Sequence, residues 1–212
     1  KRVALKIITL FGGTTNSIIA GFMCSTAFLS MWISNTATAV MMFPIGMSII
    51  NKIEEGFGTE RTNNFSKTLM LAIAYACSIG GIATLIGTPP NLAFVRILQI
   101  TFPEAPQIAF GTWMLLCLPI SILLLFITYF LLTRLLFRSD GSINIQKDMI
   151  ENEYRKLSKI TFQEKTVAII FTITALLWIF RIDLNLGFMT IPGWSSLLAN
   201  PDFIDDGVIA VM

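Results

Sequence analysis

The stretch LSMWISNTA (residues 29–37) lies in the middle of a long run of the chain that carries no charge. No Asp, Glu, Lys or Arg occurs among the 45 residues between Lys6 and Lys52. Such a run belongs in a lipid bilayer, where a polar group without a hydrogen-bond partner costs several kcal/mol. The three polar residues near its centre, Ser34-Asn35-Thr36, therefore need a reason, and a binding site is the strongest candidate.

The composition is that of an integral membrane protein. Of the 212 residues, 54% are hydrophobic and 13% are charged, whereas soluble domains carry about 25% charged residues. There is no histidine, so the usual general base and metal ligand are missing. Cys24, Cys77 and Cys117 lie singly in apolar segments and are expected to be buried structural thiols. These features argue against an enzyme.

Runs of uncharged and charged residues divide the chain into segments of an all-α polytopic membrane protein. A polar loop is expected around 52–67, and the pattern TFQE (161–164) predicts a helix-starting capping box. The expected elements are an interfacial amphipathic helix (1–13), ended by Gly12-Gly13; a re-entrant hairpin (14–51) with its tip at 34–36; a broken transmembrane helix (66–100) with its break at 84–91; a transmembrane helix (109–137); a cytoplasmic or interfacial arm (138–163); a transmembrane helix (164–182); an extracytoplasmic loop (183–206); and the start of a further transmembrane helix (207–212).

The positive charges predict the orientation of these segments. Thirteen of the fifteen Lys and Arg residues lie in 1–6, 52–67 and 134–165, so the positive-inside rule places these three regions in the cytoplasm. The first uncharged run must then leave the cytoplasm and return to it. Residues 37–51 would form a helix of about 22 Å, short for a hydrocarbon core of about 30 Å. A re-entrant hairpin therefore fits better than two complete crossings, which remain the alternative.

A hairpin tip inside the bilayer leaves carbonyl groups at the end of one helical arm and amide groups at the start of the next. Carbonyls and hydroxyls suit a hard cation, whereas amides at a helix N-terminus suit an anion. Ser30 lies one turn before Ser34, so both hydroxyls can face the same point. The alternative is that these residues only cap and bond the backbone in a packed bundle.

A second polar break is GGIATLIGTPPN (residues 80–91). Two prolines remove two amide donors and cannot continue a helix, and Gly87 permits an irregular backbone. A simple proline kink would explain Pro89 and Pro90, but not the polar residues beside them. The stretch is not a phosphate loop, because no lysine follows its glycines.

Discontinuous helices with polar breaks near the bilayer centre are typical of secondary transporters. MWISNTAT (31–38), followed by MMFP (41–44), resembles the first SNT signature of the divalent anion/sodium symporter family. GGIATLIGTPPN resembles the partner motif in the unwound part of that family's fifth helix. The family carries di- and tricarboxylates or sulfate. The resemblance runs through essentially the whole chain, although outside the motifs it is mainly one of segment order.

The resemblance implies the first half of an inverted-repeat transporter, and therefore a piece of a longer protein. It also implies a homodimer. The implied sodium ligands are side chains of the hairpin and a backbone group of the break, with a further contribution beside it: Ser30, Ser34, Asn35, Gly87 and Thr84. The implied substrate-binding residues lie at the two helix starts: Asn35, Thr36, Thr88 and Pro89. Asn91 is expected to shape the second break.

The two breaks contain no Lys or Arg, so nothing with a fixed positive charge offsets the desolvation of a dianion there. A bound sodium ion can supply that charge. The expected function is sodium-coupled symport of di- or tricarboxylates, with a C4 dicarboxylate such as succinate as the expected substrate. Sodium is the expected coupling ion, and no other cofactor and no nucleic acid are expected.

Other functions fit the same residues. Within transport, the alternatives are a sodium-independent dicarboxylate exchanger, a symporter of sulfate or another anion, and the related carriers of sodium/protons or arsenite. A different class is a membrane sensor that binds a dicarboxylate and signals through a partner.

Overall fold

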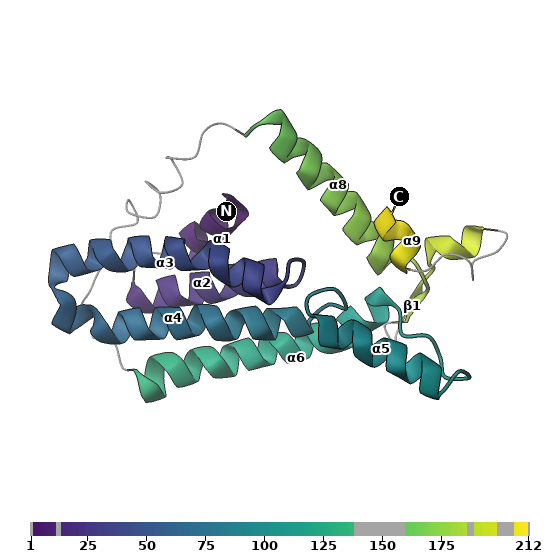
Figure 1. Ribbon diagram of the computed structural model, residues 1–212, viewed down its shortest axis with the longest axis horizontal. Coiled ribbons are helices and arrows are strands. Elements are labelled where there is room, and N and C mark those ends of the chain that lie inside the picture. Colours follow the sequence, from purple (N-terminus) through teal and green to yellow (C-terminus); the bar gives the residue numbers. More distant parts are fainter. Residues whose placement is uncertain (1, 12–13, 138–159, 186–188, 199–205, 212) are drawn as a thin grey trace.

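The computed structural model describes residues 2–11, 14–137, 160–185, 189–198 and 206–211, and this part is almost entirely helical (Figure 1). The helices are α1 (Arg2–Leu10), α2 (Thr15–Ser30), α3 (Asn35–Phe57), α4 (Thr59–Ile82), α5 (Pro89–Thr101), α6 (Phe110–Phe130) with the π-helical continuation η1 (Leu131–Leu136), α8 (Phe162–Ile179) and α9 (Asp206–Val211). Two short antiparallel strands, β1 (Leu184–Asn185) and β2 (Thr190–Ile191), and a 3-10 turn, η2 (Trp194–Leu197), lie between α8 and α9.

Four of the described helices are long and apolar enough to cross a membrane: α3, α4, α6 with η1, and α8. Helices dominate because a chain in lipid must satisfy its backbone amides and carbonyls internally. The protein is therefore an all-α, multi-pass integral membrane protein, as the composition predicted.

The predicted hairpin at 14–51 consists of α2 and α3, which are joined by a turn at residues 31–34. Its arms differ in length. The 16 residues of α2 reach about 24 Å, whereas the 23 residues of α3 reach about 34 Å, enough to cross the hydrocarbon core. The second arm is therefore longer than the sequence argument assumed, because this helix continues past Asn51 to Phe57, although the added residues include the charged Lys52, Glu54 and Glu55.

The polar loop expected around 52–67 is helical instead. Only Gly58 separates α3 from α4, and its φ of 81° is a conformation that favours glycine. The charged residues on either side of Gly58 include Lys and Glu, which favour helix formation. The charged residues of this region therefore lie on the ends of α3 and α4, where the two helices leave the apolar zone, and they do not form a loop.

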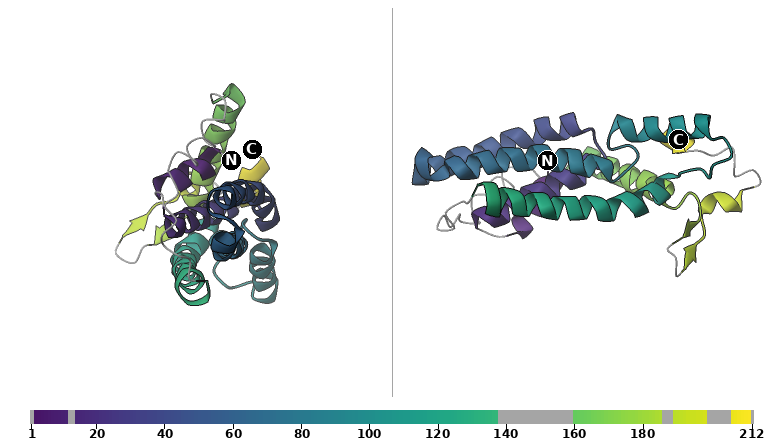
Figure 2. Two further views of the ribbon diagram at one scale, coloured as in Figure 1. Left: turned by 90° about the vertical axis from the view of Figure 1, so that its left-hand side faces the viewer. Right: turned by 90° about the horizontal axis from the view of Figure 1, so that it is seen from below.

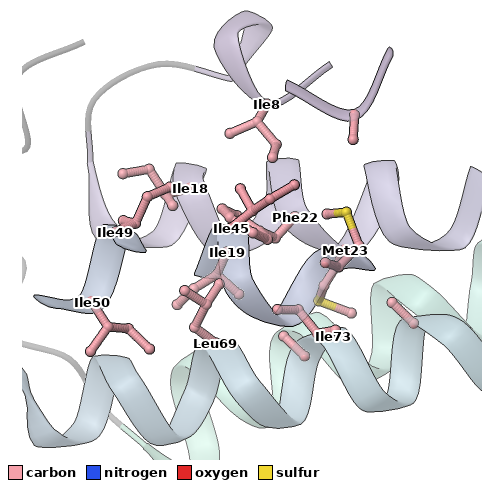
Figure 3. Close-up of a cluster of buried hydrophobic side chains, with 14 of the residues drawn as sticks. Ile8, Ile18, Ile19, Phe22, Met23, Ile45, Ile49, Ile50, Leu69 and Ile73 are labelled. Atoms are coloured by element: carbon pink, nitrogen blue, oxygen red, sulfur yellow. The ribbon is translucent and has the colours of Figure 1, made fainter. Parts of the chain in front are cut away.

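The core of the molecule is a bundle around α4, which packs along both arms of the hairpin, while α1 packs on α2 (Figures 1 and 2). On α3 the buried residues recur every three or four positions, as at Met42, Ile45, Ile49 and Ile53, which places them on one helix face. Figure 3 shows the resulting cluster of isoleucine, leucine, phenylalanine and methionine side chains.

The helices α6 and α8 bury little of their surface, and most of their large apolar side chains are exposed. In a membrane protein such faces contact lipid or another chain. The predicted capping box is confirmed, since Thr161 and Glu164 each bond the other's backbone at the start of α8. Arg2 Nη2 lies 3.2 Å from the Glu164 carboxylate, which links α1 to this end of α8.

The later predicted segments are only partly described. The arm at 138–163 lies outside the described residues except for 160–163, and so do Gly12 and Gly13. In the predicted loop at 183–206, the described residues form the two strands and the 3-10 turn. The α9 helix begins at Asp206, close to the predicted start of a further helix at 207.

Replacing Gly80 with alanine is expected to destabilise the bundle. An added Cβ at Gly80 would come within 2.6 Å of the Ala27 Cα atom on α2, so α2 and α4 would have to move apart. Overpacking of this kind costs about 1–3 kcal/mol. Thermal unfolding of the full-length protein in detergent measures the effect.

Gly56→Ala is the matched control, because a Cβ added at Gly56 meets no atom within 4 Å. In a helix this change is expected to stabilise by about 0.5–1 kcal/mol. Equal unfolding temperatures for the two variants would show that the close approach at Gly80 does not matter.

Candidate functional site

The two polar breaks meet in the structure. The turn between α2 and α3 lies beside the turn between α4 and α5 (Figure 1). The Thr84 hydroxyl donates a hydrogen bond to the Met31 carbonyl oxygen, and accepts one from the Gly87 amide at 3.1 Å. Thr84 is fully buried. One hydroxyl therefore ties the end of the first hairpin arm to the unwound segment of the broken helix.

The interruption between α4 and α5 covers residues 83–88, within and just before the predicted break at 84–91. Helix resumes at Pro89, because proline is well tolerated in the first turn, where its missing amide has no partner to lose. Pro89, Pro90 and Asn91 therefore begin α5 and do not belong to the unwound part.

Glycines allow the two breaks to approach closely. A Cβ added at Gly81 would lie 3.1 Å from the Asn35 Cγ atom, so the Asn35 side chain packs against bare backbone. A Cβ at Gly87 would lie 2.6 Å from the Gly81 carbonyl oxygen. Gly81 is therefore the common neighbour of Asn35 from the hairpin and Gly87 from the break.

Ser30 and Asn35 form an oxygen-rich contact across the hairpin. The Ser30 Oγ atom lies 2.7 Å from the Asn35 Oδ1 atom and 2.7 Å from the Cys77 carbonyl oxygen. A serine hydroxyl has one proton and cannot donate to both. Two arrangements would remove the need for a second proton. Either the Asn35 amide turns its nitrogen toward Ser30, or a cation is bound among the three oxygen atoms.

The carbonyl groups released at the end of α4 have partners. The Asn91 amide nitrogen donates to the carbonyls of Gly81 and Thr84, at 2.9 and 2.8 Å. The Trp113 indole on α6 donates to the Ile82 carbonyl at 3.0 Å. These bonds hold the unwound segment in one conformation. The sequence indicated this role for Asn91, but not the one for Trp113, whose target no local pattern reveals.

The starts of α3 and α5 flank this contact region. Ser34 caps α3, since its Oγ atom accepts a hydrogen bond from the Ala37 amide at 3.3 Å. Thr88 is the N-cap residue of α5 but makes no side-chain capping bond. Helix N-termini favour negative charge. Because α5 begins with two prolines, which lack amide hydrogens, the first turn of α3 offers the more complete set of amide donors.

The predicted site residues differ in how far their side chains are exposed. The buried group consists of Ser30, Thr84 and Gly87, while Asn35 and Thr88 are half-buried. The exposed group consists of Ser34, Thr36 and Pro89. The structure brings Ser30 together with Asn35, and Thr84 with Gly87, around Gly81. Thr36, Thr88 and Pro89 lie at the two helix starts and make no side-chain hydrogen bond to them among the described residues.

Aromatic rings from α6 and α8 pack against the hairpin tip. Trp32 stacks on Phe110 of α6, with ring centroids 6.1 Å apart, and meets Phe171 of α8 edge-on at 5.1 Å. Phe110 also stacks on Trp178 of α8 at 5.5 Å. Such pairs contribute about 0.5–1.5 kcal/mol each beyond their burial. The sequence did not indicate this cluster, because its members lie far apart along the chain.

A helical hairpin and an interrupted helix whose polar turns meet within a membrane bundle are features of a secondary transporter. The chain belongs to the citrate transporter family, whose model matches residues 1–209. This is a family of transporters and not of enzymes.

Similarity to individual proteins agrees with this class. The chain is 40% identical over 185 residues to the sodium-dependent dicarboxylate transporter SdcS of Staphylococcus saprophyticus, and 41% identical over 185 residues to SdcS of Staphylococcus aureus strain NCTC 8325. Each match covers 85% of this chain and 35% of the relative, so the chain spans about a third of the length of these relatives. The resemblance to the divalent anion/sodium symporters is confirmed.

Replacing Thr84 with valine is expected to loosen the contact between the two breaks. Valine keeps the shape of the side chain but leaves the Gly87 amide without its acceptor. An unsatisfied buried group of this kind costs about 1–3 kcal/mol. The unfolding temperature of the full-length protein should fall, and Thr84→Ser should retain it.

The control is Thr172→Val on α8, where an exposed hydroxyl only bonds the Ala168 carbonyl of its own helix. If Thr84→Val costs no more stability than Thr172→Val, the bond to the hairpin is not important.

Proposed function

We propose that this chain forms one wall of the binding site of a sodium-coupled dicarboxylate symporter. The observation that carries the proposal is the meeting of the hairpin tip with the interrupted helix through Thr84. This contact brings oxygen atoms suited to a cation next to helix starts suited to an anion. The printed names of the relatives, which are sodium-dependent dicarboxylate transporters, support the same function.

The proposed sodium ligands come from both breaks. The side-chain oxygens of Ser30, Ser34 and Asn35 would contribute from the hairpin, and the backbone of Gly87 from the break, with Thr84 holding the two together. Oxygen ligands without charge suit a hard monovalent cation. The Ser30 hydroxyl lies within hydrogen-bond distance of two acceptor oxygens but has only one proton. A cation bound among these oxygens would remove the need for a second proton, which supports this assignment.

The proposed anion position lies at the two helix starts. Asn35 and Thr36 begin α3, while Thr88 and Pro89 begin α5, so the positive ends of both helix dipoles are available to a carboxylate. We take a C4 dicarboxylate such as succinate as the substrate, in preference to the citrate of the family description, because the relatives are named for dicarboxylates.

The coupling between sodium binding and anion binding follows from the charges of the two ligands. Neither break contains Lys or Arg, so a dianion entering a low-dielectric site would meet a large desolvation cost. A sodium ion bound first supplies the missing positive charge. An inside-negative membrane potential then favours inward movement by about 2.3 kcal/mol per 100 mV for each net positive charge, so it drives uptake of a dianion only when more than two sodium ions accompany it.

The proposed setting is a homodimer in the cell membrane, with the hairpin re-entering the bilayer from the cytoplasmic side. The regions 1–6, 52–67 and 134–165 would then face the cytoplasm. The large exposed apolar area of α6 and α8 is consistent with lipid and a second subunit as neighbours.

Sodium dependence tests the proposed function directly. Uptake of radiolabelled succinate by the full-length protein in proteoliposomes is expected to fall to background when choline replaces sodium. Asn35→Ala is expected to abolish sodium-dependent uptake, because it removes a ligand shared by the ion and the anion.

The matched control is Asn63→Ala, at an exposed asparagine near the start of α4 and far along the helix from the break. It should transport as the wild type does. Undiminished uptake in choline would rule out sodium coupling, and counterflow without sodium would favour an exchanger.

The orientation is tested by cysteine labelling in a background that lacks Cys24, Cys77 and Cys117. A cysteine at Glu60, just after the α3–α4 turn, should react with a membrane-impermeant maleimide only from the cytoplasmic side. A cysteine at Glu104, beyond the end of α5, should react only from the outside. The reverse pattern would invert the proposed topology.

A further inference from the structure

Two side chains supply partners for carbonyl groups that the break frees at the end of α4. The Asn91 amide on α5 bonds the Gly81 carbonyl at 2.9 Å, and the Trp113 indole on α6 bonds the Ile82 carbonyl at 3.0 Å. Asn91 belongs to the interrupted helix itself, whereas Trp113 reaches that helix from a neighbouring one. The bond of Trp113 therefore joins the break to a helix outside both polar breaks.

The ring of Trp113 also contacts the second half of the interrupted helix. Its centroid lies 6.0 Å from that of Phe94 on α5, and the two ring planes are tilted by 59°. Trp113 further packs against the buried cluster of Leu85, Val95 and Phe110, in which Leu85 comes from the unwound segment. One side chain of α6 thus spans the break, because its N–H group bonds the end of α4 and its ring lies against α5.

The Ile82 carbonyl lies where the chain leaves α4 for the unwound segment. Turning this carbonyl away from α6 would change ψ of Ile82, and with it the direction in which the chain continues to Gly87. The preceding residue, Gly81, is the neighbour of both Asn35 and Gly87. The bond from Trp113 therefore acts on the distance between Gly87 and the hairpin tip, where the proposed sodium ligands lie.

We propose that Trp113 is a positioning residue for the sodium site and acts through the Ile82 carbonyl. The proposal rests on the sodium coupling proposed above. An indole nitrogen carries a proton and cannot coordinate a cation, so its effect on sodium is indirect. With the N–H group in place, the unwound segment is held in the arrangement that binds the ion. Without it, the break adopts other arrangements in part of the molecules, and the apparent sodium affinity falls with the fraction that remains competent.

Replacing Trp113 with phenylalanine tests the role of the N–H group. Trp113→Phe keeps an aromatic ring beside Phe94 and removes the donor. For the full-length protein in proteoliposomes, the sodium concentration for half-maximal succinate uptake is expected to rise roughly fivefold, the effect of losing one neutral hydrogen bond. The maximal uptake rate at saturating sodium should stay near that of the wild type, because excess sodium restores the competent arrangement.

Two further variants separate positioning from stability. Trp113→His restores a donor, since the imidazole Nε2 atom occupies the ring position of the indole Nε1 atom, and it should recover most of the sodium affinity. Trp194→Phe is the matched control. The Trp194 indole bonds the Leu177 carbonyl of α8 at 2.9 Å, so the same kind of hydrogen bond is lost at a place outside both breaks. This control should lower the Tm about as much as Trp113→Phe does and leave the sodium dependence unchanged.

A second measurement does not require transport. Sodium alone, without any anion, is expected to raise the Tm of the purified protein. The sodium concentration that produces half of this rise should be roughly fivefold higher in Trp113→Phe than in the wild type, and unchanged in Trp194→Phe.

The outcomes distinguish this proposal from the one on which it rests. If Trp113 only stabilises the fold, Trp113→Phe will lower the maximal rate and keep the wild-type sodium dependence, and that result overturns the proposal even where Asn35→Ala abolishes uptake. If Trp113→His needs as much sodium as Trp113→Phe, the ring and not the N–H group is responsible, and the proposal is again wrong. If sodium changes neither the Tm nor the uptake of the wild type, the proposed function fails together with this inference.

Discussion

The constraint on which the rest of the structure depends is that backbone groups freed at a helix break need partners when the surroundings are apolar. The hairpin tip and the interrupted helix each release such groups. Thr84 satisfies a carbonyl of the tip and an amide of the break with one hydroxyl, and Asn91 satisfies two carbonyls of the break. Because Thr84 of the second break supplies the partner of a carbonyl of the hairpin tip, hydrogen bonding links the position of one break to that of the other.

Packing then brings these bonds within reach. Gly80, Gly81 and Gly87 allow the backbones of α2, α4 and the unwound segment to approach more closely than any side chain would permit. Further out, Trp32 and Phe110 connect the tip to α6 and α8 through stacked rings. Polar atoms thus lie inside, glycine contacts surround them, and aromatic rings close the outer layer.

Much of this arrangement could be predicted from particular residues. The uncharged run around Asn35 indicated the membrane segment, the prolines at 89 and 90 indicated the interrupted helix, and Thr161 with Glu164 indicated a helix start that the structure has. The second break was placed too late, since 89–91 belong to α5, and Cys24 is exposed although a buried thiol was expected. Two further interpretations needed correction, for one reason. The charged residues around Gly58 were taken to mark a loop, and the second arm of the hairpin was taken to end at Asn51. Polarity, however, reports where a helix leaves the apolar zone and not where it ends.

The sequence by itself determined the class of the protein, its division into apolar segments and the two polar breaks, because hydropathy and helix-breaking residues act locally. Only the tertiary structure decided which atoms meet. The contact of Ser30 with the Cys77 carbonyl and the support from Trp113 both join helices that are distant along the chain. No periodicity encodes such contacts, because they depend on how closely the helices approach, and the glycines set that distance.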